Sequence, residues 1–203
     1  MLRIAVFVMT FLAVLVFGLK APIPGYAVEE ITWEVQAFAD GAKVSLTGTV
    51  EQVYDKLIKI NPDFSFNDIN VTDTATKLGA AENRVSCGNN GHPDWVGANE
   101  LAILWGITYL QNLAGQPSNG PGPGACGRVS CSWKSAIWWC NDNDHTYTLG
   151  SWSDIAQCAN EIRDTCWPGP YGDSEGTDDT HLVGINFQEG GWNCIVRRDE
   201  DNC

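Results

Sequence analysis

After the apolar N-terminal run, the apolar residues first alternate as in a β-strand and then recur every three or four positions as in an α-helix. Residues 31–37 and 44–46 alternate apolar and polar side chains, and the Asp-Gly dipeptide between them predicts a turn that joins two strands. Thr49, followed three residues later by Gln52, has the pattern of a capping box, so we expect a helix to begin there. The apolar residues of this helix share one face: Val50, Val53, Tyr54 and Leu57.

Two longer segments carry apolar residues every three or four positions and predict two more helices. Residues 98–114 form the first, and Gly115 is placed to close it. Residues 151–166 form the second, with Ser151 or Ser153 as the N-cap. The stripes expected to face the core are Ile103, Ile107, Leu110 and Ala114 in the first helix, and Ile155, Ala159, Ile162 and Cys166 in the second.

Four further apolar runs predict strands. Residues 126–131 and 136–140 form a hairpin around a short polar turn, and residues 183–187 and 192–196 form another. The run 136–140 is apolar on both faces, so we expect a central strand that is buried on both sides. With the helices, this order predicts an α+β fold in which two or three helices pack on an antiparallel sheet.

Residues 1–27 have the pattern of a secretory signal peptide. Arg3 precedes the apolar run 4–19, and the small residues Gly25 and Ala27 place the expected cleavage after Ala27. An uncleaved anchor is the alternative, although the apolar run is short for a membrane span and two prolines interrupt the segment that follows it. We therefore expect a secreted, extracellular protein that does not insert into membranes.

The distribution of cysteine divides the remaining chain. Residues 28–66 contain none, residues 67–84 are mostly small and polar and predict a linker, and all eight cysteines lie in residues 85–203. We expect this last part to be a disulfide-rich core domain. The N-terminal β-β-α segment is then either a layer packed on that core or a pro-segment released near Arg84. In the linker, Asn70 begins an Asn-Val-Thr glycosylation sequon.

An excess of acidic residues limits the partners. The formal net charge is −13, and loss of Arg3 and Lys20 with the signal peptide makes it −15. Nucleic acid and anionic membrane surfaces would be repelled, so we expect neither as a partner.

Eight cysteines behind a signal peptide predict four disulfides. No CxxC spacing occurs, so we expect no metal and no cofactor. Cys158 adjoins the apolar stripe of its helix and Cys194 faces the core from the last strand, so this pair would clamp helix to sheet. A tight hairpin places Cys126 opposite Cys140. The complete predicted set is Cys158–Cys194, Cys126–Cys140, Cys166–Cys203 and Cys87–Cys131.

A specific resemblance rests on residues 122–143, which read GPGACGRVSCSWKSAIWWCNDN. Together with residues 106–110, 154–156 and 192–197, they are similar to runs in small secreted cysteine-rich proteins of filamentous ascomycete fungi. That group is described as candidate effectors, so the resemblance implies a role at a plant–fungus interface. The group's pattern lacks cysteine at both positions of the predicted 158–194 pair, and their joint appearance here supports that disulfide.

The clearest candidates for catalysis are histidines beside acidic residues. His145 is a candidate general base with Asp142 or Asp144 orienting it, and His181 a candidate general acid, as in a small hydrolase or ribonuclease. The alternative is that these are solvated loop histidines, and neither GxSxG nor HExxH occurs in the chain. We therefore favour a protein without a catalytic site.

Binding is the preferred function. Trp133, at the expected tip of the hairpin, is the best exposed candidate among the tryptophans for an aromatic platform under sugar rings. The stiff loop 115–125, with Pro121 and Pro123, is a second candidate for recognition. We expect a monomeric, secreted, effector-like protein that binds a host plant protein or a cell-wall glycan. The alternatives are the hydrolase and an antimicrobial protein, since the order of elements is also similar in layout to fungal killer-toxin-like α/β sandwiches.

Overall fold

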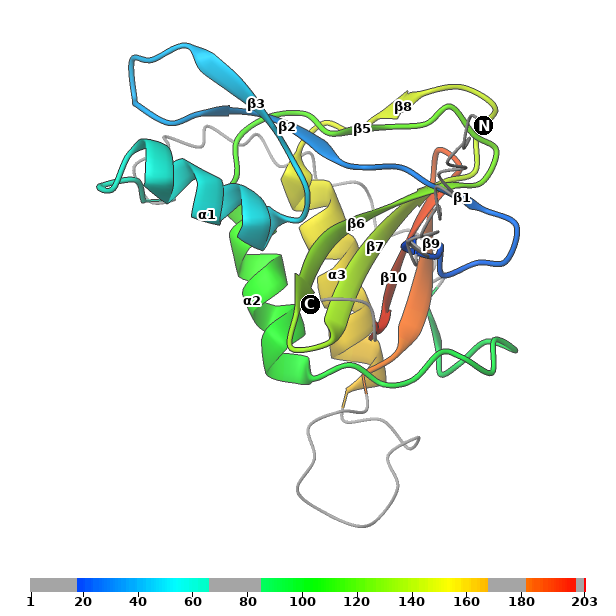
Figure 1. Ribbon diagram of the computed structural model, residues 1–203. Coiled ribbons are helices and arrows are strands. Elements are labelled where there is room, and N and C mark those ends of the chain that lie inside the picture. Colours follow the sequence, from blue (N-terminus) through cyan, green and yellow to red (C-terminus); the bar gives the residue numbers. More distant parts are fainter. Residues whose placement is uncertain (1–17, 66–84, 168–181, 200–202) are drawn as a thin grey trace, which may run out of the picture.

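The periodic runs of the sequence form strands and helices close to their expected bounds. The computed structural model describes residues 18–65, 85–167, 182–199 and 203 (Figure 1). In chain order the elements are β1 (Ala27–Val28), β2 (Thr32–Gln36), β3 (Lys43–Thr47), α1 (Val50–Ile60), β4 (Val85–Cys87), α2 (Glu100–Gln111), β5 (Ser118–Asn119), β6 (Ala125–Ser132), β7 (Ser135–Asn141), β8 (Tyr147–Thr148), α3 (Trp152–Cys166), β9 (Gly184–Gln188) and β10 (Trp192–Arg198).

A six-stranded sheet in the order β1-β6-β7-β10-β9-β4 forms the centre of the fold. Neighbouring strands are antiparallel except β1, which pairs with β6 in parallel. Strand β7 lies inside the sheet and all of its residues are buried, as its two apolar faces predict. Ile137 and Trp139 join the core cluster on one face, and Ala136 and Trp138 join the cluster on the other. The predicted α+β class is confirmed.

Helices α2 and α3 cover one face of this sheet (Figure 1). Their predicted stripes are buried there beside Trp139, except for Ala114, which lies beyond the end of α2 and is half-buried. Helix α2 begins later than expected because the Asn99 side chain caps it, accepting a hydrogen bond from the backbone N–H of Ala102 at 2.9 Å. It also ends earlier, because Asn112 and not Gly115 is its C-cap. At the start of α3, Ser151 accepts from the N–H of Ser153 at 3.1 Å and is the N-cap.

The opposite face of the sheet is covered by a loop tryptophan and by the start of the described chain. Trp95 is buried in a second apolar cluster with Trp138 and Ile195. Residues from 19 to 28 pack against the same cluster through five apolar side chains: Leu19, Ala21, Ile23, Tyr26 and Val28. The sheet is therefore covered on both sides, by helices on one and by irregular chain on the other.

The N-terminal β-β-α segment shares the main core. Trp33 of β2 is fully buried and stacks on Trp152 of α3, with ring centroids 3.7 Å apart. Its indole N–H donates to the carbonyl of Gly48 at 2.7 Å. At the start of α1, the Gln52 side chain accepts from the N–H of Thr49 at 3.1 Å, as the capping box predicts. This segment is thus a layer of the same core.

Two of the four predicted disulfides are confirmed. Cys126–Cys140 joins directly opposite residues of β6 and β7. Cys158–Cys194 links α3 to β10, and so clamps the helix to the sheet.

The other two predicted pairs, Cys87–Cys131 and Cys166–Cys203, are wrong. Cys87 bonds Cys166 instead, and Cys131 bonds Cys203. Because β4 and β6 are separated by three intervening strands, Cys87 and Cys131 lie about 19 Å apart at the usual strand spacing, far beyond the reach of a disulfide. Cys203 lies near the hairpin turn, where its carbonyl accepts from the N–H of Lys134 at 3.3 Å.

The Gly/Pro segment is more regular than its composition suggests. We expected only an irregular loop in residues 115–125, yet β5 lies within it and pairs with β8. Asn119 is buried, and its side-chain amide donates to the carbonyls of Ala125 and Trp139 at 3.2 and 2.9 Å. These bonds hold the segment beside β6 and β7.

Some expectations fall outside the described residues. They concern most of the signal peptide, the glycosylation site at Asn70 and release at Arg84, and they stay predictions. Within the described ranges, no helix has the length and apolar character needed to cross a membrane.

Replacing Trp33 by Ala tests whether the N-terminal segment is a structural layer. We expect the free energy of unfolding to fall by about 3–5 kcal/mol, because the change leaves a cavity against Trp152. Phe38→Ala, at a side chain that is 53% exposed in the same segment, should change it by less than about 0.5 kcal/mol. Denaturant unfolding of both variants measures the difference, and equal small effects would contradict the shared core.

Candidate functional site

The tip of the β6–β7 hairpin presents a tryptophan to solvent. Trp133 and Lys134 form the two-residue turn, with φ values of 47° and 58°. Two successive positive φ angles fit the tight hairpin turns whose twist matches that of the flanking strands. The Trp133 side chain is 72% exposed, so the predicted exposure of this residue is confirmed.

Helix α2 carries a partly aromatic stripe beside the hairpin tip. Leu101, Trp105 and Tyr109 follow one another at intervals of four residues and therefore share one face of the helix. The buried stripe lies on the other side of α2, which leaves Leu101 46% and Trp105 60% exposed. Isolated exposed apolar residues are ordinary, but two exposed tryptophans around one hollow are not.

A shallow groove of about 240 Å³ lies between α2 and the hairpin tip. Its lining comes from three elements that are distant in sequence: Glu51 of α1, Leu101, Ala102, Trp105 and Tyr109 of α2, and Ser132 and Trp133 of the hairpin. Most of this lining is apolar, with a carboxylate and two hydroxyls among it. A small apolar hollow with few polar groups is the usual form of a ligand site.

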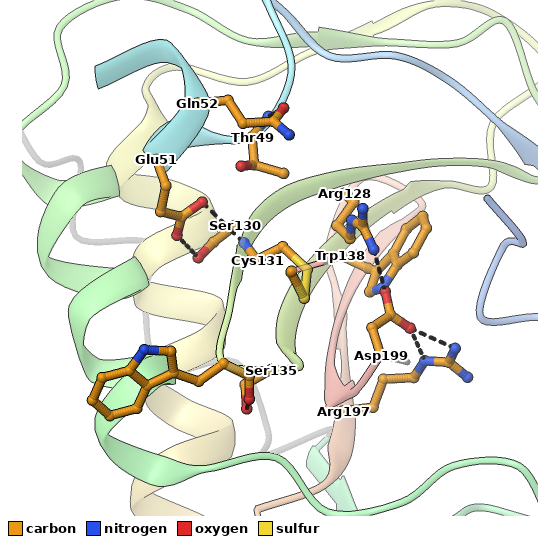
Figure 2. Close-up of a disulfide and its surroundings, with 12 residues drawn as sticks. Thr49, Glu51, Gln52, Arg128, Ser130, Cys131, Ser135, Trp138, Arg197 and Asp199 are labelled. Carbon is orange, nitrogen blue, oxygen red and sulfur yellow. Dashed lines mark hydrogen bonds and ion pairs between the residues drawn. A yellow bond between two sulfur atoms is a disulfide. The ribbon is translucent and has the colours of Figure 1, made fainter. Parts of the chain in front are cut away.

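Glu51 fixes the wall of the groove to the sheet. Its two carboxylate oxygens accept hydrogen bonds from the Ser130 hydroxyl and, at 3.0 Å, from the backbone N–H of Cys131. Figure 2 shows Glu51 reaching from α1 to these two residues of β6. A carboxylate that accepts two such bonds is held in one position, because charge-assisted hydrogen bonds are stronger than neutral ones.

Tyr109 extends the aromatic surface away from the hairpin. It stacks on Tyr54 of α1, with ring centroids 5.7 Å apart. Partial burial, followed by the nearby Tyr54 and Glu51, raises the pKa of Tyr109 above its ordinary value. At neutral pH its hydroxyl is protonated, as that of an ordinary tyrosine also is, and can donate a hydrogen bond.

A buried ionic network supports the hairpin from the other side of the sheet. Asp199 is 2% exposed and accepts from Arg128 at 3.1 Å, from the Trp138 indole at 3.0 Å and from Arg197 at 2.6 Å. These groups surround the carboxylate in Figure 2. Its backbone N–H also donates to the carbonyl of Lys134 in the hairpin turn at 2.8 Å. The turn is therefore anchored by this buried charge cluster as well as by Cys131–Cys203.

The Gly/Pro loop does not join this groove. Pro121 and Pro123 are exposed, but they precede β6, whereas Trp133 follows it. Eight residues of strand separate the two ends by about 23 Å. The two predicted binding features are therefore separate surfaces, and only Trp133 lies in a groove with other aromatic side chains.

Of the acids proposed to orient His145, Asp144 contacts it and Asp142 does not. His145 pairs with Asp144 at 2.9 Å, and both side chains are exposed. The hydrogen bond from His145, and then its charge, lower the pKa of the Asp144 carboxyl. Asp142 instead accepts from the Tyr26 hydroxyl and the Asn193 amide, each at 2.9 Å, so it does not orient His145. His181 lies outside the described residues.

Sequence reasoning missed Trp105, Tyr109 and Glu51. The signal for Trp105 was present, because Ile103 and Ile107 already supplied the buried side of the helix and left this tryptophan on the opposite side. No local pattern pointed to Glu51, whose position depends on how α1 packs against β6. Among the described residues, no group of three or more His, Cys, Asp or Glu side chains is arranged to hold a metal ion.

The Tyr26–Asp142 hydrogen bond makes stability depend on pH at the alkaline end. Burial and then the Asp142 carboxylate raise the pKa of Tyr26 from 10.0 to about 12. Between these values the unfolded chain loses this proton while the folded chain keeps it, so the stabilisation is complete below pH 10 and is lost as the pH rises towards 12. Tyrosinate absorbance should show phenols that titrate late, since the pKa of Tyr109 is raised too, and Tyr26→Phe should remove one of them. A titration that is unchanged in Tyr26→Phe would contradict this assignment.

Comparisons with protein-family models, with curated proteins and with solved structures give no match to this chain. The interpretation of the groove therefore rests on its own residues. Those residues form an anchored, partly aromatic binding surface that lies apart from the His145–Asp144 pair.

Proposed function

We propose that this chain is a secreted, effector-like protein that acts in the extracellular space at a host–fungus interface, where its aromatic groove binds a cell-wall glycan. The observation that carries the proposal is the pair of exposed tryptophans, Trp105 and Trp133, on either side of one hollow. The resemblance of residues 122–143 to fungal candidate effectors supports action at a host–fungus interface, and the groove supports glycan binding.

The disulfides are consistent with a secreted, extracellular protein. All eight cysteines are paired, and no free cysteine is present. Such bonds form and persist in oxidising compartments and are rare in the cytosol. They also constrain the unfolded chain, each contributing about 2–4 kcal/mol of stability, which suits a protein exposed to extracellular proteases.

The chemistry of the groove favours sugar rings over other ligands. The C–H face of a pyranose is apolar and packs on an indole ring, while its hydroxyls lie at the edge and need hydrogen-bond partners. Here Trp105 and Trp133 supply the rings, and the protonated Tyr109 hydroxyl and the Glu51 carboxylate supply a donor and an acceptor. A sugar can offer hydroxyls to these groups, which a purely apolar ligand cannot.

The charge of the protein selects among glycans. A net charge of −13 repels acidic polysaccharides such as polygalacturonate. Neutral polymers, including cellulose, β-glucan and chitin, carry no such penalty. We therefore assign a neutral cell-wall glycan to the groove, and the alternative of a host protein partner becomes an outcome of the binding test.

Substitution of the groove tryptophans tests this assignment. Trp133→Ala and Trp105→Ala should each weaken binding to an insoluble neutral polysaccharide by roughly fivefold or more, as truncation of a central aromatic contact usually does. Phe187→Ala is the matched control, because Phe187 is 44% exposed but lies on β9, away from the groove. Co-sedimentation with cellulose, β-glucan, chitin and polygalacturonate measures the binding.

Two outcomes would contradict the proposal. Failure of the unaltered protein to bind any neutral polysaccharide would remove the glycan and leave a protein partner as the explanation of the groove. Equal weakening by all three variants would show a non-specific effect. Circular dichroism of each variant establishes that the fold is retained, which is expected because all three side chains are exposed.

An assay in plant tissue separates binding from catalysis. If infiltrated protein causes cell death or suppresses immune responses, Trp133→Ala should reduce the response and His145→Ala should leave it unchanged, because the His145–Asp144 pair lies in solvent. Loss of the response in His145→Ala but not in Trp133→Ala would favour the hydrolase alternative. Growth inhibition of competing microbes by the same preparation would favour the antimicrobial alternative.

A further inference from the structure

The second face of the sheet also carries a cluster of buried apolar side chains. Trp138 and Ile195 are fully buried there, and Ile185 is 4% exposed. No helix covers this side in the described part of the chain, where Trp95 and residues 19–28 do so instead. An open apolar face of this kind would be an interaction or aggregation surface, so its cover matters to the folded protein.

Residues 19–27 make specific contacts with this face. The buried indole N–H of Trp95 donates to the carbonyl of Pro22 at 2.8 Å, and Pro22 is itself buried. The N–H of Tyr26 returns to the carbonyl of Ile23 at 3.1 Å and closes a turn. Trp95 would lose this acceptor if the segment were absent, and an unpaired buried donor is costly.

Tyr26 and Ala27 attach the end of the segment to β6 and its neighbours. The Tyr26 hydroxyl donates to Asp142, and its ring lies so close to Gly124 that a Cβ added there would be 3.0 Å from a ring carbon. The N–H of Ala27 donates to the carbonyl of Gly124 at 2.7 Å, and β1 then pairs in parallel with β6. These bonds protect an edge strand that would otherwise be open.

Cleavage after Ala27 would remove every one of these contacts except the pairing of Val28. It would expose the cluster around Trp138, leave the Trp95 indole without its carbonyl and uncover the edge of β6. The same sequence offers another site. Gly18 is a small residue near the end of the apolar run 4–19, whereas Ala27 lies nine residues further on, beyond two prolines.

We infer that the leader is removed at the Gly18–Leu19 bond and that residues 19–27 remain in the mature protein as the cover of the second face of the sheet. This inference rests on the proposed secretion and replaces the expected cleavage after Ala27. The segment is then a permanent structural element, and the mature chain keeps Tyr26.

Expression of the full chain in a fungal secretory host, followed by N-terminal sequencing and intact mass measurement of the medium, tests the inference. The expected first residue is Leu19. A start at Val28, or at any residue after Pro22, overturns it while leaving the secretion intact. An unprocessed chain that stays in the cell overturns both this inference and the proposed extracellular function.

Two matched variants distinguish the candidate bonds. Gly18 and Ala27 are both exposed, and a Cβ added at Gly18 meets nothing within 4 Å, so a leucine at either position should leave the fold intact. Because the residue before a leader cleavage site must be small, Gly18→Leu should lower the yield of chain that begins at Leu19 by about tenfold, and Ala27→Leu should leave it unchanged within about twofold. The opposite pattern overturns the inference. Retention of the late-titrating Tyr26 phenol in the secreted protein is an independent readout.

Discussion

Strand β7 carries apolar side chains on both of its faces, and the rest of the molecule follows from the need to bury both. The helices α2 and α3 cover one face, and the chain around Trp95 covers the other. Removing apolar surface from water stabilises this arrangement by about 25 cal/mol for each Å² that is buried. A sheet that is apolar on both sides needs two covering layers, which is why Trp95 and residues 19–28 pack on the face that α2 and α3 leave open.

Features set by local chemistry could be predicted from the sequence. The turn at Trp133, the capping box at Gln52 and the cross-strand pair Cys126–Cys140 all depend on residues close in the chain. Pairings over long separations could not be predicted in the same way. The position of Cys87 depends on β4 being an edge strand beside β9, and nothing in three residues of sequence indicates that neighbour.

In the groove, too, the features set by residues close in the chain could be predicted, and those set by contacts distant in sequence could not. Trp133 was predicted because a tight hairpin places its turn residues in solvent, whatever surrounds the hairpin. Its neighbours were not, since Glu51 reaches the groove only through the packing of α1 against β6. The two acids proposed to orient His145 also differ in this way: Asp144, its neighbour in sequence, pairs with it, whereas Asp142 bonds Tyr26 and Asn193 instead.

The Cys131–Cys203 disulfide ends the chain at the hairpin that carries Trp133. One wall of the groove is thus held by a covalent bond that a reducing compartment removes and an oxidising one maintains. The redox state of the surroundings therefore sets how rigidly Trp133 is presented. A copy of the protein in an oxidising compartment and a copy in a reducing one would share one sequence and differ in the stiffness of their aromatic surface.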